Sequence, residues 1–138
     1  MKQADAWVDG SYNAHNGLAG CGVYLRIDDE TYDISGSVTK FDNSSRNIVG
    51  EVTAALAAIK TAVDKQCSKI IVYYDYLGIE KWATGEWTCR KQISKDYVKE
   101  LNNLEKFINI SFQKVKAHSG DENNNRADRL AKQGCGLK

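Results

Sequence analysis

The stretch Ile70-Ile71-Val72-Tyr73-Tyr74-Asp75 is the strongest strand signal in the sequence, and it ends in an acidic residue. A short apolar run rich in β-branched and aromatic residues predicts a buried strand. A second apolar run near the start, Ala6-Trp7-Val8, is also followed by an acid, Asp9. Ligands of open α/β sheets gather at the carboxyl ends of strands. If the two strands are neighbours, Asp9 and Asp75 converge at one edge of the sheet.

On either side of this stretch, the hydrophobic spacing switches between strand and helix periods. Strands are expected at residues 4–9, 22–27, 31–39, 69–74 and 108–115, and helices at residues 47–64, 79–82, 94–107 and 122–135. The first three strands form an antiparallel meander, and the last two are added in parallel through helical crossovers. The predicted fold class is therefore α/β: a five-stranded mixed sheet, three antiparallel strands then two parallel, with helices on both faces and the first strand central.

The composition is that of an ordinary globular protein. Its 138 residues are enough for one domain, and we expect a single domain over residues 1–138. No apolar stretch is long enough to span a membrane, and residues 1–5 lack the apolar core of a signal peptide. The four cysteines have no Cys-x-x-Cys spacing, which favours reduced, buried thiols over zinc or disulfides. We therefore expect a cytoplasmic protein, and we treat it as a monomer.

The net charge of +1 indicates no nucleic-acid partner by itself, but the charges are unevenly distributed. Residues 1–80 carry 7 basic and 11 acidic side chains, whereas residues 81–116 carry 8 basic and 4 acidic ones. This arrangement suits a protein that holds cations in one place and phosphates in another. Lys91, Lys95 and Lys99 recur every four residues, so they line one face if this stretch is helical. That face either contacts a phosphate backbone or is merely solvated.

Two further acids lie on predicted helices. Glu51 is roughly 90° from the centre of the apolar stripe of its helix, at about 100° per residue, which places it at the edge of the buried face. Asp128 lies on the last helix, which Ser119 and Glu122 fit as a capping box. Together with the two strand-end acids, they form an oxygen-ligand cage suited to hard divalent cations. With two such ions, a carboxylate cage cleaves a phosphodiester by in-line displacement, which indicates a nuclease.

Four segments carry a resemblance to a known family. They are Val8-Asp9-Gly10-Ser11, Arg46-Asn47-Ile48-Val49-Gly50-Glu51, Tyr73-Tyr74-Asp75-Tyr76 and, most specific of all, residues 116–128 with His118-Ser119-Gly120 and Arg126-Ala127-Asp128. From about residue 5 to residue 132 the chain resembles type 1 ribonuclease H, of the bacterial ribonuclease HI kind. The resemblance implies a ribonuclease H-like fold and an endonuclease that hydrolyses the RNA strand of RNA/DNA hybrids, leaving 5′-phosphate and 3′-hydroxyl ends.

The resemblance also implies the metal ligands. Two Mg²⁺ ions are expected with substrate, and Mn²⁺ as a substitute. Asp9 would bridge both ions, Glu51 and Asp75 would complete one, and Asp128 would complete the other. His118 corresponds to a mobile group for proton transfer or product release.

An RNA/DNA hybrid is the implied partner. A ribonuclease H must see 2′-hydroxyls on one strand and none on the other, so recognition uses shape more than base sequence. The residues implied in binding are Gly10, Ser11, Arg46, Asn47 and Asn124. Trp82 and Trp87 either pack against a deoxyribose or, for Trp82 at least as readily, pack into the core.

The chain departs from the commonest pattern of the family at several points. Tyr76 and Leu77 follow Asp75, where many members carry Ser and Gln. The interval from Asp75 to His118 leaves no room for the basic, Trp-rich loop of some bacterial members. A separate N-terminal hybrid-binding module, often present in the bacterial branch that the chain resembles, is not expected.

Two alternatives to a hybrid-specific endonuclease stay open. One is another nuclease or a strand-transfer enzyme on the same fold, which would expect a different order of acids. The other is a non-catalytic hybrid-binding module. Retention of all four acids and His118 favours catalysis, because binding alone does not require four metal ligands.

Overall fold

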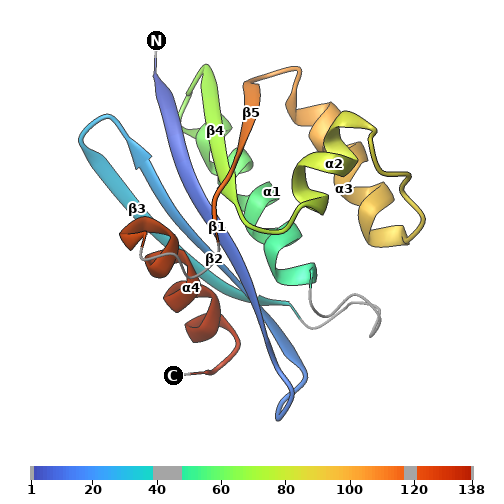
Figure 1. The fold of residues 1–138 in the computed structure, drawn as a ribbon. Helices are drawn as coiled ribbons and strands as arrows, with labels where there is room; N and C mark the ends of the chain where they lie inside the picture. Colours follow the sequence, from blue (N-terminus) through green and yellow to red (C-terminus); the bar gives the residue numbers. More distant parts are fainter. Residues whose placement is uncertain (1, 39–47, 117–120, 138) are drawn as a thin grey trace.

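Five strands form one mixed sheet through the centre of the molecule (Figure 1). The computed structural model describes residues 2–38, 48–116 and 121–137. The strands are β1 (Gln3–Asn13), β2 (Leu18–Ile27), β3 (Glu30–Val38), β4 (Lys69–Tyr74) and β5 (Asn109–Lys114). Their order is β3-β2-β1-β4-β5, with antiparallel pairing from β3 to β1 and parallel pairing from β1 to β5. The predicted sheet, with the first strand at its centre, is confirmed.

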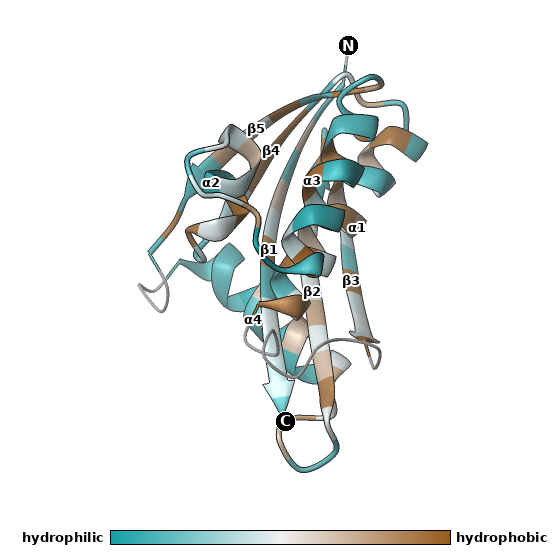
Figure 2. Ribbon diagram, turned by 90° about the vertical axis from the view of Figure 1, so that its right-hand side faces the viewer, coloured by the Kyte–Doolittle hydropathy of each residue, from teal (hydrophilic) through white to brown (hydrophobic). Residues whose placement is uncertain are grey.

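Helices cover both faces of this sheet, as predicted (Figure 1). They are α1 (Val49–Asp64), α2 (Gly78–Thr84), α3 (Gln92–Leu104) and α4 (Glu122–Gly134). Helix α1 packs on β1, β2 and β4, with α2 and α3 against its outer side, while α4 packs on the other face against β1, β2 and β3. In Figure 2 the hydrophobic stretches of β4 and β5 lie beside helices whose outward turns are largely hydrophilic. Within the described ranges, no helix has both the length and the apolar character needed to cross a membrane.

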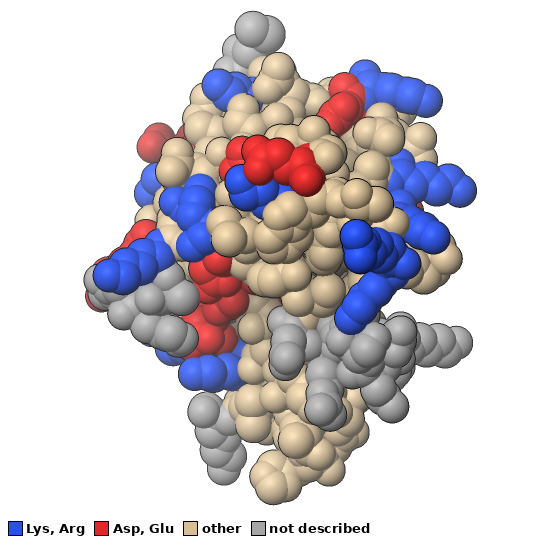
Figure 3. Space-filling view, turned by 45° about the vertical axis from the view of Figure 1, so that its right-hand side comes forward, with Lys and Arg blue, Asp and Glu red and all other residues tan. Residues whose placement is uncertain are grey.

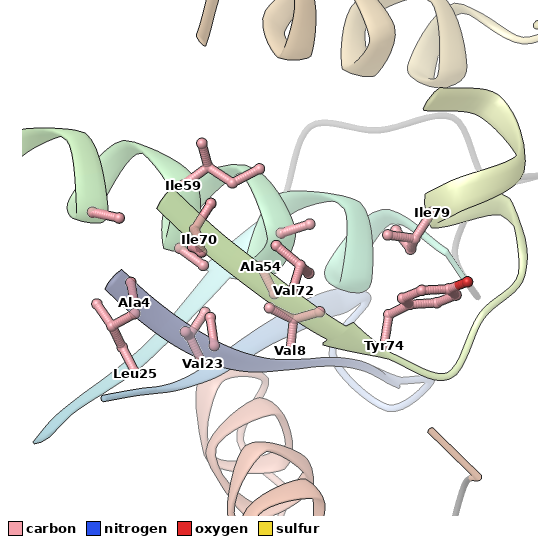
Figure 4. Close-up of a cluster of buried hydrophobic side chains, with 14 of the residues drawn as sticks. Ala4, Val8, Val23, Leu25, Ala54, Ile59, Ile70, Val72, Tyr74 and Ile79 are labelled. Atoms are coloured by element: carbon pink, nitrogen blue, oxygen red, sulfur yellow. The ribbon is translucent and has the colours of Figure 1, made fainter. Parts of the chain in front are cut away.

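The hydrophobic core fills the space between α1 and the sheet (Figure 4). Alternate residues of each strand point into it, because successive side chains of a strand face opposite sides. The labelled members are Ala4, Val8, Val23, Leu25, Ala54, Ile59, Ile70, Val72, Tyr74 and Ile79. This core fixes α1 and β4 relative to β1, and these elements position the first three predicted acids: Asp9 on β1, Glu51 on α1 and Asp75 directly after β4.

The N-terminal half of the sheet extends further than predicted. Asp9 does not end its strand, because β1 continues to Asn13 through its pairing with β2. The parallel pairing of β1 with β4 does end before it, at Trp7 and Tyr73. Strand β2 begins at Leu18, four residues before the predicted start at residue 22. Its glycines serve close packing: a Cβ at Gly20 would lie 1.9 Å from the Ala131 carbonyl oxygen of α4.

Two helix predictions also need correction. Helix α3 ends at Leu104, three residues before its predicted end at Phe107, and Phe107 is 70% exposed. The residue of α3 with no exposed surface is instead Tyr97, whose hydroxyl donates a hydrogen bond to the Ile79 carbonyl at 2.8 Å. Helix α4 is not capped by Ser119, which lies outside the described residues. Its N-cap is Asp121, whose side chain accepts hydrogen bonds from the next residues of the helix.

Candidate metal centre

Asp9 reaches the site from the middle of the central strand. It lies opposite Gly22 of β2, and its side chain is on the sheet face that α4 covers, since Val8 and Gly10 point toward α1. Only 8% of Asp9 is exposed. Its Oδ1 atom accepts a hydrogen bond of 2.9 Å from the backbone nitrogen of Gly10. A buried acid with a single neutral donor is poorly compensated, which is costly unless positive charge is supplied.

Glu51 is brought to the same place by the close approach of α1 to β1. A Cβ atom at Gly10 would lie 2.3 Å from the Glu51 backbone nitrogen, and one at Gly50 would lie 2.1 Å from the Gly20 carbonyl oxygen. Glycine at both positions therefore allows the first turn of α1 to contact the sheet. Glu51 is only 4% exposed, and from the first turn of α1 its side chain reaches the end of β4.

Asp75 follows directly after β4 and is tied to Glu51. The Glu51 Oε1 atom accepts hydrogen bonds from the backbone nitrogens of Asp75, at 3.1 Å, and Tyr76, at 3.3 Å. Each of Asp9, Glu51 and Asp75 offers a carboxylate oxygen, and these three atoms lie within 4.8 Å of one another. The structure thus brings together three of the four acids that the sequence singled out.

Mutual repulsion and burial raise the proton affinity of this cluster. Burial, followed by the charge of Asp75, raises the pKa of Asp9 to about 8, and the Gly10 N–H opposes this only in part. Burial, followed by the charges of Asp75 and Asp9, raises the pKa of Glu51 well above its ordinary value. Cations close to the carboxylates would relieve both effects. The donor set, carboxylate oxygens alone, is the one that Mg²⁺, Mn²⁺ and Ca²⁺ prefer.

Asp128 faces the cluster from α4. Its charge and a hydrogen bond between the two side chains add to the rise in the pKa of Asp9. It is not one of the three acids that lie within 4.8 Å of one another. Its outer oxygen, Oδ2, pairs with the ammonium of Lys132 at 3.1 Å. Lys132 was not among the residues predicted from the sequence, although the spacing of four residues on a helix is a recognised ion-pair signal.

The remaining predicted residues fall into three groups. Gly10 and Ser11 lie on β1 directly after Asp9, and Gly10 is already required for packing against α1. Asn124 is buried one turn before Asp128, and its Oδ1 atom has no hydrogen-bond partner among the described residues. Arg46, Asn47 and His118 lie outside the described residues.

Aromatic side chains flank the cluster on the α2 side. Trp82 packs into the core, with its ring 5.7 Å from that of Tyr76 and 6.4 Å from that of Tyr97. Trp87 lies at the surface, 39% exposed, with its ring 6.3 Å from that of Tyr76. The core interpretation of Trp82 therefore holds, while Trp87 presents an aromatic ring to solvent.

Charged side chains are segregated on the surface around this region. Figure 3 shows acidic side chains gathered in a stripe, with lysine and arginine side chains to either side of it. Lys91, Lys95 and Lys99 are all exposed, at the start and along the outer side of α3. A negative site beside positive flanks is the arrangement expected from the sequence.

Comparisons with known proteins show which family this chain belongs to. The sequence model of the RNase H family matches residues 1–136. Ribonuclease H of Prosthecochloris aestuarii is 33% identical over 139 residues, which cover 96% of this chain and 94% of that protein. The chain therefore belongs to the RNase H family, and the expectation of a ribonuclease H is confirmed at this level.

Solved structures agree on the fold. The N-terminal RNase H domain of Rv2228c from Mycobacterium tuberculosis, solved as a fusion with maltose-binding protein, superposes with a TM-score of 0.82 at 18% identity, covering 99% of this chain and 95% of that chain. LC11-RNase H1, solved in complex with an RNA/DNA hybrid, superposes with a TM-score of 0.73 at 14% identity, covering 94% and 97%. The ribonuclease H-like fold predicted from sequence is thus confirmed.

Proposed function

We propose that this protein is an endonuclease that hydrolyses the RNA strand of RNA/DNA hybrids with two divalent cations, leaving 5′-phosphate and 3′-hydroxyl ends. The observation that carries the proposal is the cluster of Asp9, Glu51 and Asp75, whose carboxylate oxygens lie within 4.8 Å of one another. Folding alone does not favour three such acids in one place, because their repulsion and burial cost free energy. Membership of the RNase H family supports a role for the cluster in binding catalytic metal ions.

The residues present fit divalent cations. Asp9, Glu51 and Asp75 would hold one ion, and Asp9 with Asp128 a second, with Mg²⁺ as the natural ion and Mn²⁺ as its substitute. Two bound ions would activate a water molecule and stabilise the leaving 3′ oxygen. The chain's own contribution is to hold the carboxylates rigidly: the Gly10 N–H orients Asp9, and two backbone N–H groups orient Glu51. The buried Oδ1 atom of Asn124, which has no hydrogen-bond partner in the part of the chain that the structure describes, is a further oxygen one helical turn from Asp128 that a bound group would satisfy.

An RNA/DNA hybrid is the substrate that best fits the surroundings of the cluster. A structural neighbour with the same fold, LC11-RNase H1, was solved with such a hybrid. In our proposal the hybrid contacts Gly10, Ser11 and Asn124 beside the acids, together with Arg46 and Asn47. His118 assists proton transfer or product release. The exposed lysines of α3 lie to one side, where they can contact a phosphate backbone.

We also propose a cytoplasmic location. Cys21, Cys67, Cys89 and Cys135 are all free thiols, and three of the four are buried. Unpaired cysteines in this number suit a reducing compartment.

The test is a cleavage assay on labelled RNA/DNA, RNA/RNA and DNA/DNA duplexes with Mg²⁺, in which the cut ends are mapped. The proposal expects internal cuts in the RNA strand of the hybrid alone, with 5′-phosphate and 3′-hydroxyl ends. Asp9→Asn should abolish these cuts. Asp28→Asn is the matched control, because Asp28 lies in the turn between β2 and β3 with a φ of 54°, which asparagine tolerates.

The possible outcomes separate the alternatives. Cleavage of DNA duplexes or removal of single nucleotides from one end would indicate another nuclease on this fold. Hybrid binding without any cleavage, by the wild-type protein and by Asp9→Asn alike, would indicate a binding module.

A further inference from the structure

Helix α4 carries Asp128, yet little apolar side-chain packing fixes its orientation. Its buried residues are Asn124, Ala127 and Ala131. The two alanines contact glycines of β2: a Cβ at Gly22 would lie 2.2 Å from the Ala127 carbonyl oxygen. Such contacts set how closely the helix approaches the sheet. Small side chains interlock little, so they constrain rotation about the helix axis less than larger ones would.

Polar contacts supply the missing constraint. On the β3 side, the guanidinium of Arg126 makes a two-pronged contact with Asp33: Nε donates to Oδ1 at 2.8 Å, and Nη2 donates to Oδ2 at 2.5 Å. Further along the helix, the Ser35 hydroxyl donates to the Leu130 carbonyl at 2.7 Å. A two-pronged arginine–carboxylate contact fixes direction as well as distance.

The same guanidinium joins a row of side chains that crosses the sheet. Arg126 stacks over the ring of Tyr24, 5.0 Å from its centre. The Tyr24 ring lies 5.8 Å from that of Trp7, which in turn stacks on Tyr73 at 4.5 Å with the rings 7° from parallel. Asp33, Arg126, Tyr24, Trp7 and Tyr73, which we name the cross-sheet row, link β3 and α4 to β2, β1 and β4. Trp7 and Tyr73 each lie two residues before an acid of the metal centre.

Arg126 and Asp128 lie on different sides of α4. Residues two positions apart in sequence are separated by about 200° around the helix axis. Arg126 therefore points to β3, while Asp128 faces Asp9. The carboxylate of a side chain on a helix lies about 6 Å from the helix axis. If α4 rotated by about 20°, such a carboxylate would move by about 2 Å, which is enough to break a metal–oxygen contact.

We propose that Arg126 is a positioning residue, whose contacts with Asp33 and Tyr24 fix the rotation of α4 and so hold Asp128 against Asp9 in the metal centre. This inference rests on the proposed function for the role of Asp128. The pair is partly exposed, 47% for the Arg126 side chain and 38% for that of Asp33. An exposed ion pair adds little to global stability. Its loss should therefore change the orientation of α4 without unfolding the protein.

Two substitutions separate position from charge. Arg126→Lys keeps the positive charge but loses the two-pronged contact. Asp33→Asn keeps Arg126 but weakens its contact with residue 33. If Arg126 acted only through its charge, Arg126→Lys would behave as wild type, because it leaves both charges of the pair in place. If it acts through position, both should show altered N–H residual dipolar couplings for α4 relative to the sheet, measured by NMR without metal. Both should also need about tenfold more Mg²⁺ for half-maximal cleavage, with an unchanged KM for hybrid.

The controls use the same helix and the same pair. Arg129→Lys should match wild type, because among the described residues Arg129 forms no ion pair. The double variant Asp33→Arg/Arg126→Asp should recover most of the loss by restoring a cross-pair contact. Unaltered couplings in Arg126→Lys and Asp33→Asn would overturn the inference even if cleavage fell. A wild-type protein without cleavage would instead overturn the proposed function.

Discussion

The Oε1 atom of Glu51 lies 3.1 Å from the backbone nitrogen of Asp75 and accepts its hydrogen bond. This contact joins the first turn of α1 to the end of β4, so Glu51 has two roles. Its charge belongs to the carboxylate cluster, and its oxygen satisfies two backbone N–H groups, the second being that of Tyr76. A substitution can remove the first role and keep the second.

Glu51→Gln and Glu51→Ala should therefore differ in stability but not in activity. Glutamine keeps an acceptor oxygen for both N–H groups, so the variant should remain as stable as wild type or become more stable, since repulsion with Asp9 and Asp75 is relieved. Alanine leaves both N–H groups without this partner and should cost about 1–3 kcal/mol of unfolding free energy. Both should lower the cleavage rate by at least about 100-fold, at the upper end of losses for disturbed metal sites. Urea unfolding and hybrid cleavage measure the two effects, and equal stabilities would contradict the structural role.

Stability without metal should fall as pH rises, and Asp9 should be one cause. Its pKa is about 8 in the folded protein, against about 3.9 for an unperturbed aspartate. Between these values the folded protein retains a proton that the unfolded chain has lost, so the contribution of Asp9 to stability declines with rising pH. Melting temperatures in chelator should fall from about pH 4 to pH 8 less steeply in Asp9→Asn than in wild type. Mg²⁺ should raise the wild-type melting temperature most at the alkaline end. If the melting temperatures of wild type and Asp9→Asn fell in parallel with pH, the raised pKa of Asp9 would be contradicted.

Some parts of this structure were predicted correctly because a local sequence pattern determines them. The bounds of β4 were predicted as Lys69–Tyr74 and observed as such, since a fully apolar run ended by an acid offers few other interpretations. The convergence of Asp9 and Asp75 followed from strand order alone.

Other parts depend on contacts between distant segments. Gly20 and Gly22 look like turn residues, and only the backbone of α4 against them reveals their role in packing. Periodicity placed Glu51 at the edge of the buried face of its helix, but it gave no sign of the hydrogen bonds that its side chain accepts from residues 24 and 25 positions later. The cross-sheet row likewise links β3 to β4 through contacts that no local pattern specifies.

His118→Ala should slow turnover without eliminating it. The metal ligands carry the chemistry in our proposal, and the histidine only assists proton transfer or product release. General acid–base assistance contributes typically about 100-fold to 10,000-fold, so cleavage should fall by no more than this and remain measurable. Single-turnover and steady-state rates on the hybrid would show which step is slowed. A loss as complete as that in Asp9→Asn would mean that the role of His118 is larger than proposed.

Gly22→Ala should displace α4 and damage both stability and cleavage. The new Cβ would lie 2.2 Å from the Ala127 carbonyl oxygen and 2.4 Å from the Ala131 nitrogen, which are backbone atoms that cannot move alone. Overpacking of this kind costs about 1–3 kcal/mol. Gly36→Ala on β3 is the matched control, because its Cβ would meet only the Cys21 sulfur at 3.5 Å, an ordinary contact. Denaturant unfolding and cleavage should separate the two variants, and equal losses would contradict the packing argument.

The final prediction concerns Lys91, Lys95 and Lys99. The Lys95 backbone nitrogen bonds the Lys91 carbonyl at 3.1 Å, so the first two are one helical turn apart, and all three side chains are exposed. If this side of α3 contacts the phosphate backbone of the hybrid, replacing all three with glutamine should weaken binding about equally for every sequence. The salt dependence of binding should flatten by about 0.9 per lost phosphate contact, the value for duplex DNA.

A charge-matched control distinguishes a local contact from a general loss of positive charge. Lys2, Lys65 and Lys69 lie around the start of β4, whereas Asp75 follows its end. Replacing them with glutamine changes the net charge by the same amount but should leave the salt slope unaltered, because phosphate contacts are local and longer-range effects are screened. Cleavage at saturating hybrid should be preserved in both triple variants, since neither touches the carboxylate cluster. An unaltered salt slope in the variant of Lys91, Lys95 and Lys99 would mean that these lysines do not contact the hybrid, which would then be bound by the residues around the metal centre.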